Sequence, residues 1–176
     1  MSANKHLASI YICGRNAVKE ALKANRIISI YLSEGFSDND ILQSIKKNAI
    51  PTKKVSAQEL DNKSDKGKHQ GIVAEIKPYE YLDLNEIIRR SKNVKNPVIV
   101  VLDGINDPHN LGAILRCSDV FNVSGVVISK HNQVPLNATV AKTSAGAINY
   151  VPVAIVNNIN QALEKLKENG YWVVTT

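Results

Sequence analysis

Residues 98–130 of the chain read VIVVLDGINDPHNLGAILRCSDVFNVSGVVISK, and this stretch predicts the fold class. Residues 98–102 are apolar and mostly β-branched, which is typical of a buried strand. Residues 103–110 contain Gly, Asn, Asp and Pro in close succession and predict a turn. A helix follows, and residues 126–129 predict the next strand. This order is a βαβ unit, whose strands are expected to be parallel neighbours joined by a right-handed crossover.

The helix of this unit has start and stop signals. Asp107 is a predicted N-cap, and Pro108 suits the first helical position. Asn122 and Gly125 are the predicted stop. Between them, apolar or small side chains recur at helical spacing and predict one buried stripe, made of Leu111, Ile114, Leu115, Ser118 and Phe121.

Two polar residues of the helix lack an obvious structural purpose. Asn110 lies in the first turn, at the carboxyl edge of the predicted sheet, where open α/β folds bind ligands. Arg116 lies on the flank of the apolar stripe, so we expect it to be half-buried and to need an anionic or carbonyl partner. The structural alternatives are that Asn110 caps the helix and that Arg116 extends to solvent or pairs with Asp119. The pattern alone leaves both open.

The composition is that of a globular protein, with 176 residues, 44% hydrophobic and 22% charged. No apolar run has the length of a membrane span, and the start of the chain shows no signal-peptide pattern. Cys13 and Cys117 form no C-x-x-C motif, which suits reduced thiols in the cytoplasm. The histidines lack metal-ligand spacing, so we expect no metal.

The net charge of +6 is unevenly distributed. Residues 1–77 hold 13 basic against 8 acidic side chains, whereas residues 96–176 hold 5 of each. A polyanion would therefore be attracted mainly to the first half of the chain. A basic surface that serves only solubility is the alternative interpretation.

The rest of the chain alternates predicted strands and helices, which indicates an α/β protein. We expect a small α/β domain at residues 1–78, a linker at 79–96 with a short helix over 84–90, and a parallel-sheet domain at 97–176. In the first domain the predicted strands are 10–12, 27–32, 52–55 and 72–76, and the helices are 15–24, 38–48 and a short one capped by Ser56. In the last domain further helices are predicted at 137–147 and 158–169, and strands at 150–155 and 171–175.

The stretch LDGINDPHNLGAILRCSDVFNVSGVVI closely resembles the first signature of the SpoU/TrmH branch of the SPOUT RNA methyltransferases, N-x-G-x-x-x-R. Here that signature is Asn110, Gly112 and Arg116. The segment LNATVAKTSAGA, residues 136–147, is similar to the family's next recurrent segment. Upstream, YICGRNAVKEAL and HQGIVAEI resemble the substrate-binding domain of RlmB-like members.

This resemblance implies methyl transfer from S-adenosylmethionine to a ribose 2′-hydroxyl of structured RNA, with a guanosine of large-subunit ribosomal RNA as the expected target. Transfer RNA is an alternative substrate. The resemblance assigns Arg116 to activating the nucleophile and Asn110 to shaping the site around it. It also implies a cytoplasmic protein and, for complete members, a homodimer.

In the first domain the residues expected to contact RNA are Arg15, Lys66, Lys68, His69 and Gln70, which suit phosphates and unpaired bases. The alternative is that His69 and Gln70 only hydrogen-bond their own loop.

Family members continue through a trefoil knot that holds the cofactor, so the resemblance implies a Rossmann-like SPOUT domain that is only partly represented here. We expect the chain as given to be catalytically incomplete, with only Thr175 and Thr176 near the cofactor. A non-catalytic RNA-binding remnant is therefore the alternative function. An unrelated nucleotide-binding enzyme is disfavoured, because neither G-x-G-x-x-G nor G-x-x-x-x-G-K-[ST] occurs.

Overall fold

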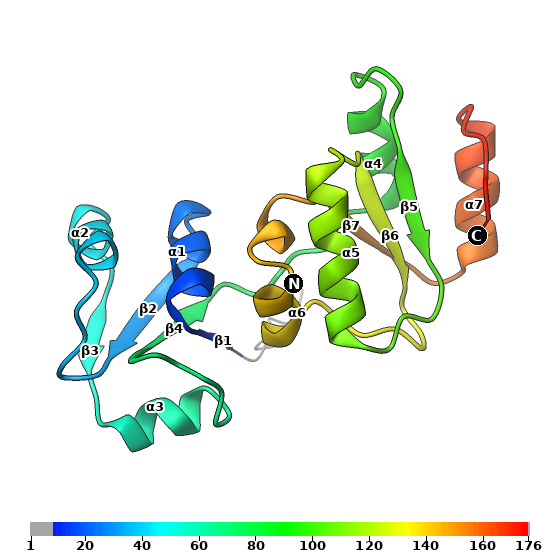
Figure 1. Ribbon diagram of the computed structural model, residues 1–176. Helices are drawn as coiled ribbons and strands as arrows, with labels where there is room; N and C mark the ends of the chain where they lie inside the picture. Colours follow the sequence, from blue (N-terminus) through cyan, green and yellow to red (C-terminus); the bar gives the residue numbers. More distant parts are fainter. Residues whose placement is uncertain (1–8, 176) are drawn as a thin grey trace, which may run out of the picture. The chain divides into compact units, whose positions relative to one another are not determined.

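The computed structural model describes residues 9–175, which form two structural units divided between Tyr79 and Glu80. Figure 1 shows a sheet with helices in each unit. The expected α/β class, with a small first domain and a parallel sheet in the second, is confirmed.

The first unit is built on a four-stranded sheet of order β1-β4-β2-β3. Its strands are β1 (Ile10–Cys13), β2 (Ile27–Leu32), β3 (Thr52–Lys54) and β4 (Ile72–Ile76). Strand β4 is antiparallel to both β1 and β2, and β3 is parallel to β2. Each strand was predicted, because β-branched residues bounded by Gly, Pro or Asn are a short-range signal.

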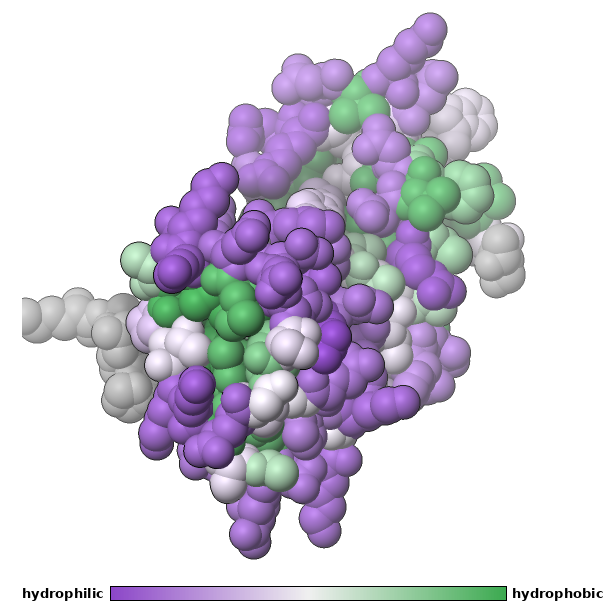
Figure 2. Space-filling model, turned by 60° about the vertical axis from the view of Figure 1, so that its left-hand side comes forward, coloured by the Kyte–Doolittle hydropathy of each residue, from purple (hydrophilic) through white to green (hydrophobic). Residues whose placement is uncertain are grey.

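Three helices cover this sheet: α1 (Arg15–Lys23), α2 (Asn39–Lys47) and α3 (Ala57–Lys63). Helices α1 and α2 lie beside each other (Figure 1). Helix α3 inserts Leu60 between Val55 and Val73 on the opposite face. The predicted cap of α3 is confirmed, since the amide of Glu59 donates to Ser56 Oγ at 3.2 Å. In the view of Figure 2 the surface is predominantly hydrophilic, and hydrophobic side chains gather in a few separate patches.

The second unit contains a parallel sheet of order β5-β6-β7. The strands are β5 (Ile99–Leu102), β6 (Gly125–Ser129) and β7 (Val153–Val156). The helices are α4 (Leu84–Ser91), α5 (Pro108–Val120), α6 (Ala138–Thr143) and α7 (Ile159–Glu168), with a 3₁₀ turn η1 at Ala147–Asn149. Helices cover both faces of the sheet, as a parallel sheet requires. Val127 packs against α4 and α7, and the next residue of the strand, Ile128, is also fully buried.

The segment predicted as a linker, residues 79–96, contributes to the second unit from residue 80 onward. Helix α4 places Leu84, Ile87 and Ile88 in its core. Leu82 also forms a parallel bridge with Ala154 of β7.

Three expectations about local structure were wrong. Residues 171–175 form no strand: a strand exists only when it pairs with a neighbour, and this segment takes part in no ladder of the described chain. The helix predicted over 137–147 ends at Thr143, because Ala145 and Gly146 adopt left-handed backbone conformations. Phe121 does not belong to the buried stripe of α5 and is 79% exposed.

Candidate functional site

The first candidate site is the amino-terminal half of α5, at the carboxyl edge of the second unit's sheet. Asp107 caps this helix, accepting a hydrogen bond from the amide of His109 at 2.8 Å, and Pro108 occupies the first turn, both as predicted. Because Asp107 supplies the cap, Asn110 is not needed for it. The side chain of Asn110 is exposed.

Arg116 is exposed, so the expectation that it would be half-buried was wrong. The reason is that α5 buries a narrow stripe, made of Leu111, Gly112, Leu115 and Ser118. The flank that carries Arg116 faces solvent, since the neighbouring Val120 is 76% exposed. In the described part of the chain Arg116 forms no ion pair with Asp119. Arg116 follows Asn110 by six positions, a rise of about 9 Å along the axis, so the structure places them on one helix without bringing them together.

Gly112, the middle residue of the N-x-G-x-x-x-R signature, explains how α5 is seated. A Cβ atom added here would lie 1.9 Å from Thr143 Oγ1 and 2.7 Å from Thr143 Cβ. The Thr143 hydroxyl lies 3.2 Å from the carbonyl of Pro108, with the carbonyl of Thr139 in its own helix as a second acceptor at 2.9 Å. Glycine therefore permits the close approach of α6, and α6 holds the first turn of α5 in which Asn110 lies.

The loops that follow β5 and β6 are joined at the same edge of the sheet. The amide of Ile105 donates to Gln133 Oε1 at 3.0 Å, and the amide of Val134 donates to the carbonyl of Ile105 at 2.9 Å. This pairing links the two loops at the entrance to α5 and satisfies both backbone groups of Ile105 and the amide of Val134.

The residues expected nearest to a cofactor are Thr175 and Thr176. Thr175 is exposed, and Thr176 lies outside the described residues. Tyr171 and Trp172 line a hollow of about 410 Å³ together with Pro97. Pro97 lies at the amino end of β5, so this hollow is opposite the carboxyl edge of the sheet, where a ligand was expected. Within residues 9–175 no cluster of His, Cys, Asp and Glu could hold a metal, and no helix is long and apolar enough to span a membrane.

The second candidate site is the loop end of the first unit, which we define as residues 14–16, 33–36 and 64–71. Backbone hydrogen bonds join these three segments. The amide of Ser33 donates to the carbonyl of Gly71 at 2.9 Å, and the amide of Gly14 donates to the carbonyl of Ile72, the residue directly after the third segment, at 3.3 Å. All five residues predicted to contact RNA therefore lie at one end of one sheet.

Two of these five residues stabilise the loop itself. Gln70 Oε1 accepts a hydrogen bond from the amide of Arg15 at 2.9 Å, at the start of a helix whose N-cap, Gly14, has no side chain to cap it. His69 Nδ1 accepts from the amide of Gly71 at 3.0 Å, and His69 Nε2 lies 3.2 Å from Asp61 Oδ1. His69 therefore makes the hydrogen bond within its own loop that the alternative interpretation expects, whereas Gln70 bonds the start of α1.

The other three residues, Arg15, Lys66 and Lys68, are exposed. The guanidinium carbon of Arg15 lies 5.4 Å from the ring centroid of Phe36. Sequence reasoning missed Phe36. The available signal was an aromatic side chain directly after the turn Ser33–Gly35, beside a basic loop.

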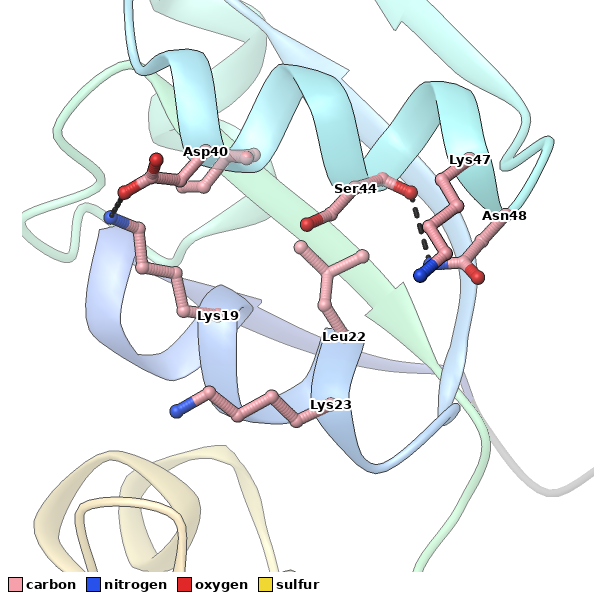
Figure 3. Close-up of a pocket in the computed structure, with 8 residues that line it drawn as sticks. Lys19, Leu22, Lys23, Asp40, Ser44, Lys47 and Asn48 are labelled. Atoms are coloured by element: carbon pink, nitrogen blue, oxygen red, sulfur yellow. Dashed lines mark hydrogen bonds and ion pairs between the residues drawn. The ribbon is translucent and has the colours of Figure 1, made fainter.

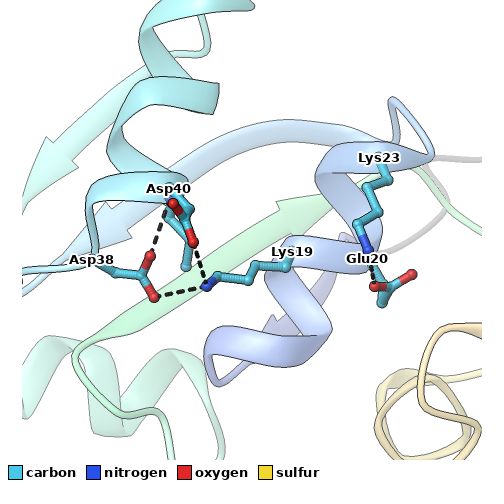
Figure 4. A network of polar contacts seen from close by, with 6 residues as sticks. Lys19, Glu20, Lys23, Asp38 and Asp40 are labelled. Atoms are coloured by element: carbon cyan, nitrogen blue, oxygen red, sulfur yellow. Dashed lines mark hydrogen bonds and ion pairs between the residues drawn. The ribbon is translucent and has the colours of Figure 1, made fainter.

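A groove between α1 and α2, about 440 Å³ in volume, is also lined by lysines (Figure 3). Two of its three lysines, Lys19 and Lys23, are paired with carboxylates, whereas the third is Lys47. Lys19 Nζ lies 3.1 Å from Asp38 and 3.5 Å from Asp40, and Lys23 lies 2.7 Å from Glu20 (Figure 4). The hydrogen bond to Asp38 raises the pKa of Lys19. This groove is therefore a weaker candidate for binding an anion than the loop end.

Comparisons with known proteins match both units. A model of the SpoU rRNA methylase family matches residues 97–176, and a model described as RNA 2′-O ribose methyltransferase substrate binding matches residues 11–82. The chain is 44% identical over 172 residues to a TrmH family tRNA/rRNA methyltransferase of Staphylococcus haemolyticus, covering 95% of this chain and 69% of the relative. It is 42% identical over 175 residues to a protein of the same description from Staphylococcus saprophyticus, covering 97% and 70%.

Solved structures share the fold. An rRNA methyltransferase from Sinorhizobium meliloti, with AdoMet bound, superposes with a TM-score of 0.71 at 18% identity, covering 92% of this chain and 59% of that chain. The SpoU methyltransferase AviRb from Streptomyces viridochromogenes superposes with a TM-score of 0.70 at 15% identity, covering 92% and 58%. The chain thus spans about three fifths of the length of these structures.

Proposed function

Because the chain belongs to the SpoU/TrmH family of RNA methyltransferases, we propose that it serves in methyl transfer from S-adenosylmethionine to a ribose 2′-hydroxyl of structured RNA. The observation that carries this proposal is the order of the two matches, a substrate-binding unit followed by a methylase unit. The first model's description, rRNA methylase, favours ribosomal RNA, and our proposed target is a guanosine of the large subunit. The relatives are named for both tRNA and rRNA, so transfer RNA is the competing substrate. The proposal includes a cytoplasmic location and, for the complete protein, a homodimer.

In this proposal Arg116 acts on the nucleophile through its charge. A guanidinium is always protonated in proteins, so Arg116 cannot remove the proton of the 2′-hydroxyl. Its exposed fork can donate hydrogen bonds to the oxygen as negative charge develops there, or to the adjacent phosphate. Asn110, on the first turn of the same helix, would orient the ribose beside it.

The first unit would hold the RNA. Its excess of basic residues attracts the phosphate backbone, and Lys66 and Lys68 offer exposed charges in a loop whose backbone is fixed by His69 and Gln70. Positioning of this kind raises the rate of a transfer reaction by bringing the hydroxyl to its partner in a suitable orientation.

A second candidate function is RNA binding without methyl transfer. It is favoured by one observation: the residues predicted to contact RNA gather at the loop end, whereas Asn110 and Arg116 are not brought together on α5. This function would use the same loop end and would leave Arg116 without a catalytic role.

One assay separates the two functions. The chain is incubated with labelled S-adenosylmethionine and transcripts of large-subunit rRNA or tRNA, and 2′-O-methylation is read from resistance of the methylated linkage to alkaline cleavage. For methyl transfer, Arg116→Ala should lower the rate by about 10²–10³-fold, as for the loss of one donor to a developing negative charge, while RNA binding is kept. Arg116→Lys should not restore it, because an ammonium lacks the planar fork. Arg90→Ala, another exposed arginine of the second unit, is the matched control.

The outcome that favours the second candidate is equally specific. RNA binding by the chain, together with no methyl transfer and no heat of S-adenosylmethionine binding in calorimetry, would reject catalysis by this chain. Near-normal transfer by Arg116→Ala would show that this arginine is structural.

RNA binding has its own test. Changing Lys66 and Lys68 together to Ala should weaken RNA binding and lower its dependence on salt, because fewer counterions are released. Lys46→Ala with Lys47→Ala, two exposed lysines at the end of α2, should change the salt dependence less. Equal effects of the two pairs would remove the loop end from the RNA-binding surface.

A further inference from the structure

Phe36 holds the side chain of Arg15 in a defined place. Phe36 follows a tight turn in which its amide donates to the carbonyl of Ser33 at 3.1 Å, and its ring is half-buried. The ring packs so closely on Gly71 that a Cβ atom there would lie 3.3 Å from it. A guanidinium above an aromatic ring is attracted to the ring face, so Phe36 restricts where an otherwise flexible side chain lies.

The spacing of this pair decides where a further planar group can stack. The guanidinium carbon is 5.4 Å from the ring centroid, which is too short for a nucleobase to enter between them, since each aromatic layer needs about 3.5 Å. Arg15 is exposed, however, so the outer side of its guanidinium is accessible. Arginine planes are common stacking surfaces for unpaired RNA bases.

Gln70 supplies hydrogen-bond donors beside Arg15. Its Oε1 is engaged by the amide of Arg15, which fixes the orientation of the carboxamide. The Nε2 group therefore carries two N–H donors, and neither finds an acceptor in the described part of the chain. Lys66 and Lys68, on the same loop, add positive charge.

From these contacts we propose that the loop end of the first unit binds an unpaired RNA nucleotide. Its base stacks on the outer side of the Arg15 guanidinium, and the amide of Gln70 donates to the base edge or its phosphate. Phe36 is a positioning residue that acts through Arg15. A paired base cannot reach this surface because it is stacked within its helix, so the site distinguishes loops from duplexes. The proposal rests on the RNA-binding part of the proposed function and adds which RNA feature the unit recognises.

The test uses the whole chain and two labelled RNAs of equal length, a hairpin with an unpaired loop and a full duplex, in fluorescence anisotropy. The wild-type chain should bind the hairpin more tightly. Phe36→Leu should weaken hairpin binding by about 5-fold, and Arg15→Lys by a similar factor, with duplex binding unchanged. Tyr150→Leu, an exposed aromatic residue of the second unit, is the control and should change neither.

The double variant provides the sharper readout. If Phe36 acts through Arg15, Phe36→Leu combined with Arg15→Lys should weaken hairpin binding little more than Arg15→Lys alone. Additive losses, or equal losses for hairpin and duplex, would overturn the proposal. Unfolding midpoints in urea exclude misfolding as the cause. Unchanged hairpin binding by Phe36→Leu would reject this inference and leave the proposed function standing, whereas no RNA binding by the wild-type chain would reject both.

Discussion

In the second unit Asn110 and Arg116 stand on one helix, whereas in the first unit Arg15, Phe36 and Gln70 come from three segments that meet at one end of a sheet. The helix is positioned by its buried stripe, so its polar residues need no contacts of their own. The loop end is positioned by single hydrogen bonds, so its polar residues hold one another. We therefore expect the site on the helix to be disrupted mainly by substitutions of buried side chains. We expect the loop end to be disrupted by substitutions that remove a single hydrogen bond or ring contact.

The largest effect is expected where α5 meets its sheet. Leu115 is fully buried, so Leu115→Ala should lower the free energy of unfolding by about 2–5 kcal/mol through lost burial and a cavity. Phe121→Ala, on the same helix but exposed, should change it by less than about 0.5 kcal/mol. Urea denaturation measures both. A large loss at Phe121 would show that its side chain is covered in solution.

A smaller effect is expected from the contact between α5 and α6. Gly112→Ala should lower the free energy of unfolding by about 1–3 kcal/mol, because the new methyl group meets Thr143. Gly35→Ala is the matched control, since a Cβ atom there has no neighbour within 4 Å. Thr143→Gly added to Gly112→Ala should recover part of the loss. Equal stability of the two single variants would contradict the close approach.

In the first unit, the contribution of Tyr79 to the free energy of unfolding is expected to depend on pH. Burial raises the pKa of Tyr79 to about 12, although the nearby Arg26 guanidinium, 4.6 Å from its ring, opposes this. The folded unit therefore keeps a proton that the unfolded chain loses near pH 10. This contribution to stability is present below pH 10 and is lost as the pH rises towards 12. The loss in the free energy of unfolding is on the order of 2 kcal/mol.

Tyr79→Phe has no phenol to ionise and should lose less stability over this pH range. Urea denaturation of both proteins below pH 10 and near pH 12 measures the difference. The same loss of stability in both proteins would mean that Tyr79 is accessible to water.

The smallest effect is expected at the cap of α1. Gln70→Ala removes the acceptor for the amide of Arg15 and should lower the free energy of unfolding by about 1 kcal/mol. Gln43→Ala, on the exposed side of α2, is the control and should have almost no effect. If both variants were equally stable, the loop end would not depend on this hydrogen bond.

Much of each unit could be predicted from residues close together in the chain. The cap at Asp107 with Pro108, the cap at Ser56 and the strands β1 to β4 each depend on a few consecutive residues, and all were found. The exposure of Arg116 could not be predicted in this way. It depends on the width of the stripe of α5 that the sheet and α6 cover. The strands of the sheet and α6 are separated from Arg116 by up to tens of residues in the sequence.

The sequence by itself determined the alternation of strands and helices, the βαβ unit and the family signature, because backbone preference and side-chain periodicity act over a single turn or strand. Only the tertiary structure decided that Gly112 is needed for the approach of Thr143, that Gln70 caps a helix 55 residues away and that Phe36 holds Arg15. It also decided that residues 171–175 form no strand. The first three depend on a partner from a distant part of the chain, which is brought into contact only when the chain folds, and the last depends on the absence of a pairing strand within the described residues.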